Sequence, residues 1–217
     1  MKVFHTPRVA AAFALLAGLS AAPAFGMSIS YYLDQSNINA APYADGQNYL
    51  QVTISDNVNG NIDFTVQTLA PLSSHAGTNY GIDSFGFNTT LGISAANIAG
   101  PSGWNIQTTQ NQDGFGNFIA VVNGTGSNRV DPLHFSIIGI AGDTPLDYVR
   151  LSSGNAGEGN VDFAAHVAGL NTTVTSGYFG GSAPVPEADT WAMMVAGLGL
   201  VGMSLRGRKK GARPIQT

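Results

Sequence analysis

Apolar and polar residues alternate strictly along two neighbouring stretches of this chain, and that alternation limits the folds open to it. Positions 50, 52 and 54 are apolar, as are positions 62, 64 and 66, and polar residues stand between them. Asn59-Gly60 separates the two runs, and this pair tolerates the positive φ angles that a tight turn demands. The pattern predicts two antiparallel strands, 50–54 and 62–66, joined as a hairpin.

The rest of the segment between residues 25 and 184 shows similar short runs. Gly, Asn, Ser and Pro separate them, and no stretch of this segment keeps the helical period of 3.6 residues. We therefore expect an all-β fold, a single antiparallel β-sandwich of about eight or nine strands. The further strands are expected at 29–33, 84–88, 104–109, 117–122, 133–140, 161–167 and 174–179.

The aromatic residues of these runs are the expected core. The runs 118–122 and 135–140 are apolar at nearly every position, which is typical of central strands covered on both faces. An exposed sugar-binding platform is the alternative for Trp104 and for Tyr31 with Tyr32, although aromatic residues in strands are more often buried. The predicted core residues are Phe64, Phe85, Phe87, Trp104, Phe118, Phe135 and Phe163.

The first 26 residues have the layout of an export signal. Lys2 and Arg8 precede the apolar stretch 9–19, and Ala22-Pro23-Ala24 supplies the small residues that signal peptidase recognises. We therefore expect a signal peptide over 1–26. The residues that follow, 27–183, are then one extracytoplasmic domain.

The end of the chain combines a polar motif at 185–190, an apolar run at 191–205 and a basic tail at 206–213. As a helix, the apolar run would span about 22 Å, against about 30 Å for the hydrocarbon core of a bilayer. Arg206, Arg208, Lys209 and Lys210 follow directly, and basic residues favour the cytoplasmic side. We expect a single transmembrane helix rather than a buried helix with a solvated tail, and a basic stop that leaves the domain outside the cytoplasm.

Individual residues of this tail follow a known order. Val185, Pro186 and Glu187 are followed by Ala188, and Trp191 opens the apolar run. The tail resembles the PEP-CTERM sorting signal of Gram-negative bacteria that make extracellular polysaccharide, in which Pro stands at the position of Ala188. The resemblance implies that an exosortase recognises Val185, Pro186, Glu187 and Trp191 and cleaves near Pro186-Glu187. It also implies an inner-membrane intermediate and a final location at the cell surface or in the extracellular matrix.

The segment between the two signals is acidic. Residues 25–184 hold two cationic side chains, Arg129 and Arg150, and eleven acidic ones, a formal charge of −9. Nucleic acid is therefore not expected as a partner, because binding phosphates needs clustered cations. The chain has no cysteine, so disulfides cannot stabilise the exported domain.

Few residues of the sequence suggest chemistry. His75, His134 and His166 stand far apart, outside the spacings that prepare a zinc site, and there is no Gly-x-Ser-x-Gly motif. We therefore expect neither an enzyme nor a cofactor. Calcium is the weaker alternative, because Asp45, Asp56 and Asn59 lie in oxygen-rich turns. Asp and Asn are, however, also common turn formers in the absence of metal.

These observations predict an exported, non-enzymatic surface or matrix protein with a structural or adhesive role in a polysaccharide biofilm or floc. Its expected partners are signal peptidase, an exosortase, transiently the inner membrane, and extracellular polysaccharide. Two alternatives stay open. One is a carbohydrate- or calcium-binding module, and the other is a small secreted hydrolase or lyase that acts on the polysaccharide.

Overall fold

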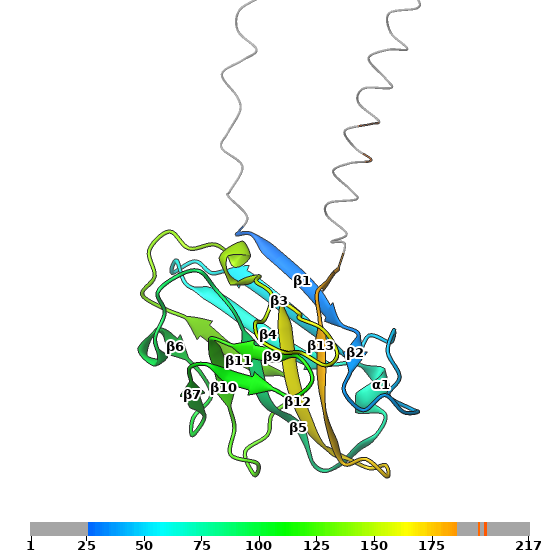
Figure 1. Cartoon of the computed structure of the whole chain (residues 1–217). Helices are drawn as coiled ribbons and strands as arrows, with labels where there is room; N and C mark the ends of the chain where they lie inside the picture. Colours follow the sequence, from blue (N-terminus) through cyan, green and yellow to red (C-terminus); the bar gives the residue numbers. More distant parts are fainter. Residues whose placement is uncertain (1–25, 186–194, 196–197, 199–217) are drawn as a thin grey trace, which may run out of the picture.

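The computed structural model describes residues 26–185 together with Val195 and Leu198, and it consists mainly of two six-stranded antiparallel sheets (Figure 1). The predicted signal peptide, the motif residues from 186 on, the predicted transmembrane helix and the basic tail otherwise lie outside the described residues. The first sheet has the order β14 (Ala183–Pro184), β1 (Ser28–Leu33), β3 (Leu50–Asp56), β4 (Ile62–Thr68), β11 (Leu133–Ile137) and β6 (Ile98–Ala99). The expected all-β, antiparallel fold is confirmed.

The second sheet lies against the first. Its order is β2 (Gln35–Ser36), β13 (Ser176–Gly181), β12 (Phe163–Leu170), β5 (Ala76–Phe87), β10 (Ala120–Asn123) and β7 (Asn105–Gln107). The remaining elements are the hairpin of β8 (Gln110–Gln112) and β9 (Gly116–Phe118), the short helix α1 (Ala70–Ser73), and the 3₁₀ turns η1 (Ala95–Asn97) and η2 (Pro145–Tyr148). In the described part of the molecule, secondary structure is therefore carried almost entirely by strands.

The hairpin predicted around Asn59-Gly60 is confirmed. Strands β3 and β4 pair from Leu50 with Thr68 to Asp56 with Ile62, and Gly60 has a φ angle of 71°. The inward positions of both strands are buried and the alternate positions are partly exposed, as the period of two predicts. One face of the first sheet is therefore buried in the core.

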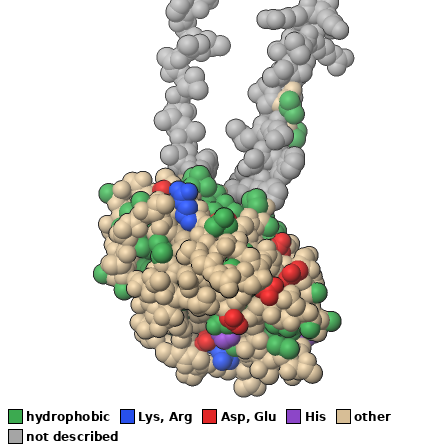
Figure 2. Space-filling model, viewed as in Figure 1, with side chains coloured by type: hydrophobic (Ala, Val, Ile, Leu, Met, Phe, Trp, Pro, Cys, Tyr) green, Lys and Arg blue, Asp and Glu red, His purple; other side chains and the backbone are tan. Residues whose placement is uncertain are grey.

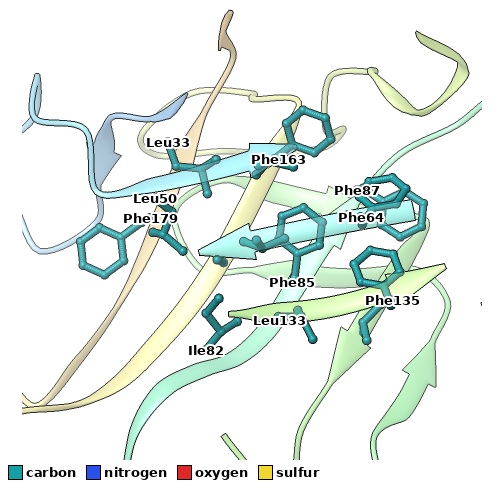
Figure 3. Close-up of a cluster of buried hydrophobic side chains, with 14 of the residues drawn as sticks. Leu33, Leu50, Phe64, Ile82, Phe85, Phe87, Leu133, Phe135, Phe163 and Phe179 are labelled. Carbon is teal, nitrogen blue, oxygen red and sulfur yellow. The ribbon is translucent and has the colours of Figure 1, made fainter. Parts of the chain in front are cut away.

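The core lies between the two sheets, and Figure 3 shows phenyl rings from both meeting there. Phe64 of the first sheet stacks on Phe135 of the same sheet with ring centroids 4.5 Å apart, and its ring centroid lies 5.1 Å from that of Phe87 in the second sheet. Phe85 and Phe163 of the second sheet are fully buried beside them. Six predicted core residues are buried, and the seventh, Trp104, is half-buried against the edge of this core.

A second, smaller core lies on the outer face of the second sheet. Phe115 and Phe118, from the β8–β9 hairpin, pack there over glycine positions of the strands. A Cβ atom at Gly180 would lie 2.6 Å from the ring of Phe115, and one at Gly86 would lie 2.8 Å from that of Phe118. The two glycines therefore make room for the rings, and the hairpin covers part of the face that a two-layer fold would leave to solvent.

Several predicted strand boundaries were wrong. The run 117–122 is divided between β9 and β10 at Ile119, which is 39% exposed, and the run 133–140 ends at Ile137. The described residues form fourteen strands, more than the eight or nine expected, and six of these strands hold only two or three residues. Strands this short carry too few residues for an alternating pattern to show in the sequence.

Both ends of the described domain lie at the same end of the first sheet. Met27 and Asp56 exchange hydrogen bonds where β1 begins, and β14 runs antiparallel to β1. The backbone N–H of Val185 donates to the carbonyl oxygen of Ser30 at 2.8 Å. The chain therefore starts its first strand and leaves its last strand close together (Figure 1).

Candidate functional site

A bulge in β5 places a carboxylate on the outer face of the second sheet. His166 of β12 pairs with Ser84 and Val167 pairs with Ile82, so Asp83 is an extra residue in β5. A bulge of this kind re-aims side chains and is common beside functional sites. The carboxylate of Asp83 accepts a hydrogen bond from the backbone N–H of Gly126 at 3.0 Å and faces β12.

Arg129 reaches the same place from a loop. The neighbouring residue, Val130, forms an isolated bridge with Ile82, which brings the loop against β5. Arg129 Nε lies 3.6 Å from Oδ1 of Asp83, and Arg129 Nη1 donates to the carbonyl oxygen of Asn79 at 3.0 Å. One of the two arginines of the domain is thus fixed beside a carboxylate.

His166 completes this cluster. Its Nδ1 lies 3.2 Å from Oδ2 of Asp83, and its ring stacks on Tyr178 with centroids 4.5 Å apart. The side chain is 20% exposed. Burial lowers the pKa of His166 below its ordinary value, although the hydrogen bond to Asp83 favours the protonated form. At neutral pH the site therefore presents a neutral imidazole.

An open pocket of about 350 Å³ adjoins the cluster. It forms at a second irregularity of β12, where Gly169 has a φ angle of 79° and its missing Cβ lets β5 approach closely. Acidic, cationic and histidine side chains gather together on the lower part of the surface in Figure 2. The polar side chains that line the pocket are Thr78, Arg129, His166, Asn171, Thr175 and Ser176.

A second pocket, of about 320 Å³, lies over β4 and β11 and contains the residue types of a hydrolytic triad. Its hydrogen bonds do not follow that arrangement. Ser136 Oγ donates to Asp63 at 2.6 Å, whereas Nδ1 of His134 lies 3.1 Å from the hydroxyl of Thr65. In a triad the histidine hydrogen-bonds the nucleophile. Here the hydroxyl of Ser136 is bonded to a carboxylate instead of to His134, so these residues do not form a triad.

The carboxylates of two calcium candidates, Asp45 and Asp56, already accept hydrogen bonds from the backbone of other segments. Asp45 accepts the N–H of Ser36 at 2.8 Å, and Asp56 accepts that of Met27 at 3.0 Å. The N–H of Asn59 donates to the side chain of Asn57. Among the residues that the structure describes, no three histidine or acidic side chains are grouped as a metal site would require.

The structure also places the aromatic and sorting candidates. Tyr31 packs against Phe163 with ring centroids 5.4 Å apart, and Tyr32 follows on the opposite side of the strand, so the two rings do not form one platform. Val185 is hydrogen-bonded to β1, whereas Pro186, Glu187, Trp191 and the four basic stop residues lie outside the described residues. In the described parts of the chain, no helix has the length and hydropathy needed to cross a bilayer.

The sequence alone did not predict the cluster of Asp83, Arg129 and Tyr178 around His166, which was expected only to stand far from the other histidines. In the structure, His166 contacts Asp83 and Tyr178 and its side chain is only 20% exposed. The sequence held one clue to the cluster. Arg129 is one of only two cationic residues between positions 25 and 184, so a specific role for its side chain is expected. The bulge at Asp83 depends on pairing between distant segments, which no local pattern records.

Comparison with known proteins gives one family match. The model of the PEP-CTERM protein-sorting motif matches residues 184–209. The match begins at Pro184, the last residue of β14, so the motif overlaps the edge of the described domain. No curated protein and no solved structure matched the chain.

Proposed function

Because the chain carries a PEP-CTERM protein-sorting motif, we propose that it is an exported protein that an exosortase releases from the inner membrane to the cell surface or the extracellular matrix. There the β-sandwich of residues 27–183 serves a structural or adhesive role in a polysaccharide biofilm, without catalysing a reaction. The observation that carries the proposal is the motif match, which adjoins an edge strand of a folded domain.

Two features of the domain support an extracellular matrix role. Its charge of −9 and its scarcity of cations suit a hydrated environment and disfavour adsorption to anionic surfaces. Its stability rests on two aromatic cores and needs no disulfide. Such a domain can persist outside the cell as a stable module.

The test is terminal peptide mapping by mass spectrometry on protein recovered from the surface and matrix fractions of the native host. The proposal predicts a mature chain that starts near residue 25–27 and ends near Pro186. A Glu187→Gln variant should keep its C-terminal peptides and stay with the membrane, because the motif is altered. Glu158→Gln, which changes a glutamate outside the motif, is the matched control and should be processed normally. Matrix protein that still contains residues 191–217 would contradict sorting by an exosortase.

A saccharide-binding module is the second candidate, and the pocket beside His166 favours it. Hydroxyl, amide and guanidinium groups line a space of about 350 Å³ there, next to the stacked pair of His166 and Tyr178. That size falls at the lower end of the roughly 300–1,000 Å³ typical of small-molecule sites. Such groups can hydrogen-bond the hydroxyls of one sugar ring.

Isothermal titration of the processed protein with host polysaccharide tests this candidate. Asn171→Ala should weaken binding about tenfold, since one hydrogen bond contributes about 1 kcal/mol or slightly more. Thr173→Ala, in the same turn but not lining the pocket, should bind normally. Repeating the titration with calcium and with a chelator examines metal dependence. An absence of heat with polysaccharide in both conditions would exclude the candidate.

A further inference from the structure

Exposed apolar side chains gather at the end of the first sheet where both chain ends lie. Val58 is fully exposed at the tip of the β3–β4 turn, Leu146 in η2 is 52% exposed, and Ile138 just after β11 is 37% exposed. Scattered exposed apolar residues are ordinary, but a group of them at one end of a molecule marks an interaction surface. We refer to Val58, Ile138 and Leu146 as the apolar end.

Strand register fixes the position of this group. Asp56 pairs with Ile62 and Ile62 pairs with Ile137, so the turn 57–61 and Ile138 lie side by side beyond the last pairs. Asp56 also exchanges hydrogen bonds with Met27, at the start of the described domain. The 3₁₀ turn η2 packs against β1 and β3, and its Tyr148 meets Phe64 near the start of β4. The apolar end and the chain ends are therefore one region of the surface.

The carboxylates near the apolar end are bound within the protein. Asp63 accepts hydrogen bonds from Asn57 and Ser136, and Asp143 accepts one from Tyr148 at 2.5 Å. Asp147 caps η2 by accepting from Thr144, and Asp56 accepts from Met27. These carboxylates have partners within the protein and need not turn outward to find them.

The length of chain beyond the domain limits what can cover this surface. Val185 is fixed to Ser30, and Trp191, the first residue of the apolar run 191–205, is six residues further on. Six residues reach at most about 20 Å when fully extended. If the run is held in a bilayer, as the proposed function requires, Val185 is held within that distance of the lipid surface, and the apolar end lies at the same end of the first sheet.

We propose that the apolar end docks on the zwitterionic lipid surface while the tail is anchored, with Val58 entering the headgroup region. The apolar side chains favour the interface, whereas the charge of −9 disfavours anionic lipid. Docking holds the motif residues 186–190 in one short span between domain and membrane, where an exosortase can reach them. This inference rests on the membrane intermediate of the proposed function.

The chain has no cysteine, so a single cysteine introduced into the full chain is the only site that a thiol-reactive label can modify. We would place an environment-sensitive fluorophore at Val58→Cys or Leu146→Cys, and at Thr173→Cys as the control. Thr173 is exposed in the turn between β12 and β13, at the opposite end of the molecule (Figure 1). In phosphatidylcholine vesicles, iodide should quench the labels at 58 and 146 about threefold less than the label at 173, because the headgroup region excludes the ion.

The outcomes separate the inference from the function on which it rests. Vesicle flotation is measured first, and a full chain that does not float with lipid contradicts the membrane intermediate itself. If the chain floats and all three labels are quenched equally, docking is wrong and anchoring stands. Protection that persists in detergent and grows with protein concentration means that a second copy covers the apolar end, which also overturns lipid docking. A Val58→Ser substitution should reduce the protection of the label at 146, whereas Thr173→Ser should not.

Discussion

The imidazole of His166 is subject to two opposing influences. Burial against Tyr178 and the strands favours the neutral ring, whereas the carboxylate of Asp83 at 3.2 Å favours the protonated ring. Arg129, also beside Asp83, opposes protonation further. Burial is the largest of these effects, so the pKa of His166 is lower in the folded protein than in the unfolded chain.

The lowered pKa predicts a loss of stability in mild acid. Below about pH 6.5 the unfolded chain binds a proton at this position that the folded protein does not, so the free energy of unfolding falls, by at most about 1.4 kcal/mol per pH unit. His166→Gln should make the dependence shallower between pH 7 and 5. Urea unfolding at several pH values measures this, with His134→Gln on the other sheet as the matched variant. An equal effect of both variants would show that His166 is not responsible.

Asn57 determines the shape of the β3–β4 turn through its side chain. Its Oδ1 accepts the N–H groups of Asn59 and Asn61 at 2.9 and 3.2 Å, and its Nδ2 donates to Asp63. Asn57→Ala should reduce the free energy of unfolding by about 1–2 kcal/mol, since backbone donors and a carboxylate lose their partner. Because the carboxylates of the calcium candidates Asp45 and Asp56 already accept backbone N–H groups, the thermal midpoint of the wild type should be the same in calcium and in chelator. A higher midpoint in calcium would restore the metal-site interpretation.

At the scale of elements, the β8–β9 hairpin is the least expected part of the fold. It brings Phe115 and Phe118 over strands that lack side chains at Gly180 and Gly86, which turns an outer sheet face into a second core. Close packing leaves little freedom for these rings to move. The hairpin is therefore fixed to the second sheet by shape.

Substituting Gly180 tests this packing. Gly180→Ala should reduce the free energy of unfolding by about 1–3 kcal/mol, because its Cβ would overlap the ring of Phe115. Gly157→Ala, where no atom lies within 4 Å of the added carbon, should change it little. Phe115→Leu in the Gly180→Ala background should cost less than the two single changes combined. Strict additivity in chemical denaturation would mean that the ring and the glycine do not compete for space.

The elements differ in how well the sequence predicts them. Alternation identified β3, β4 and their turn, and the aromatic residues of the strands identified most of the core, because both depend on local pattern and on burial. The Asp83 bulge, the bridge of Ile82 to Val130 and the glycine–ring contacts join distant segments. Their positions depend on tertiary register, so the cluster around His166 could not be predicted from residue spacing.

At the scale of the whole molecule, charge is distributed unevenly along the chain. The full sequence has a formal charge of −4, whereas residues 25–184 carry −9. Removing the basic tail therefore leaves a domain with stronger self-repulsion. The thermal midpoint should rise with sodium chloride between about 0.02 and 0.3 M, where the Debye length falls from about 20 Å to about 6 Å and the repulsion is screened. The processed form should respond more than the full chain; an equal response would assign the effect to local ion pairs.

The pairing of β1 with β14 joins the beginning and the end of the domain. In export that starts from the N-terminus, β1 crosses the membrane first, yet one of its two neighbours consists of Ala183 and Pro184, the last residues of the domain. Until those residues arrive, one edge of β1 keeps free backbone groups on which another chain could add a strand. In such export, the first sheet can be completed only when Pro184 arrives, which is also where the sorting motif begins, so the fold closes as the motif emerges.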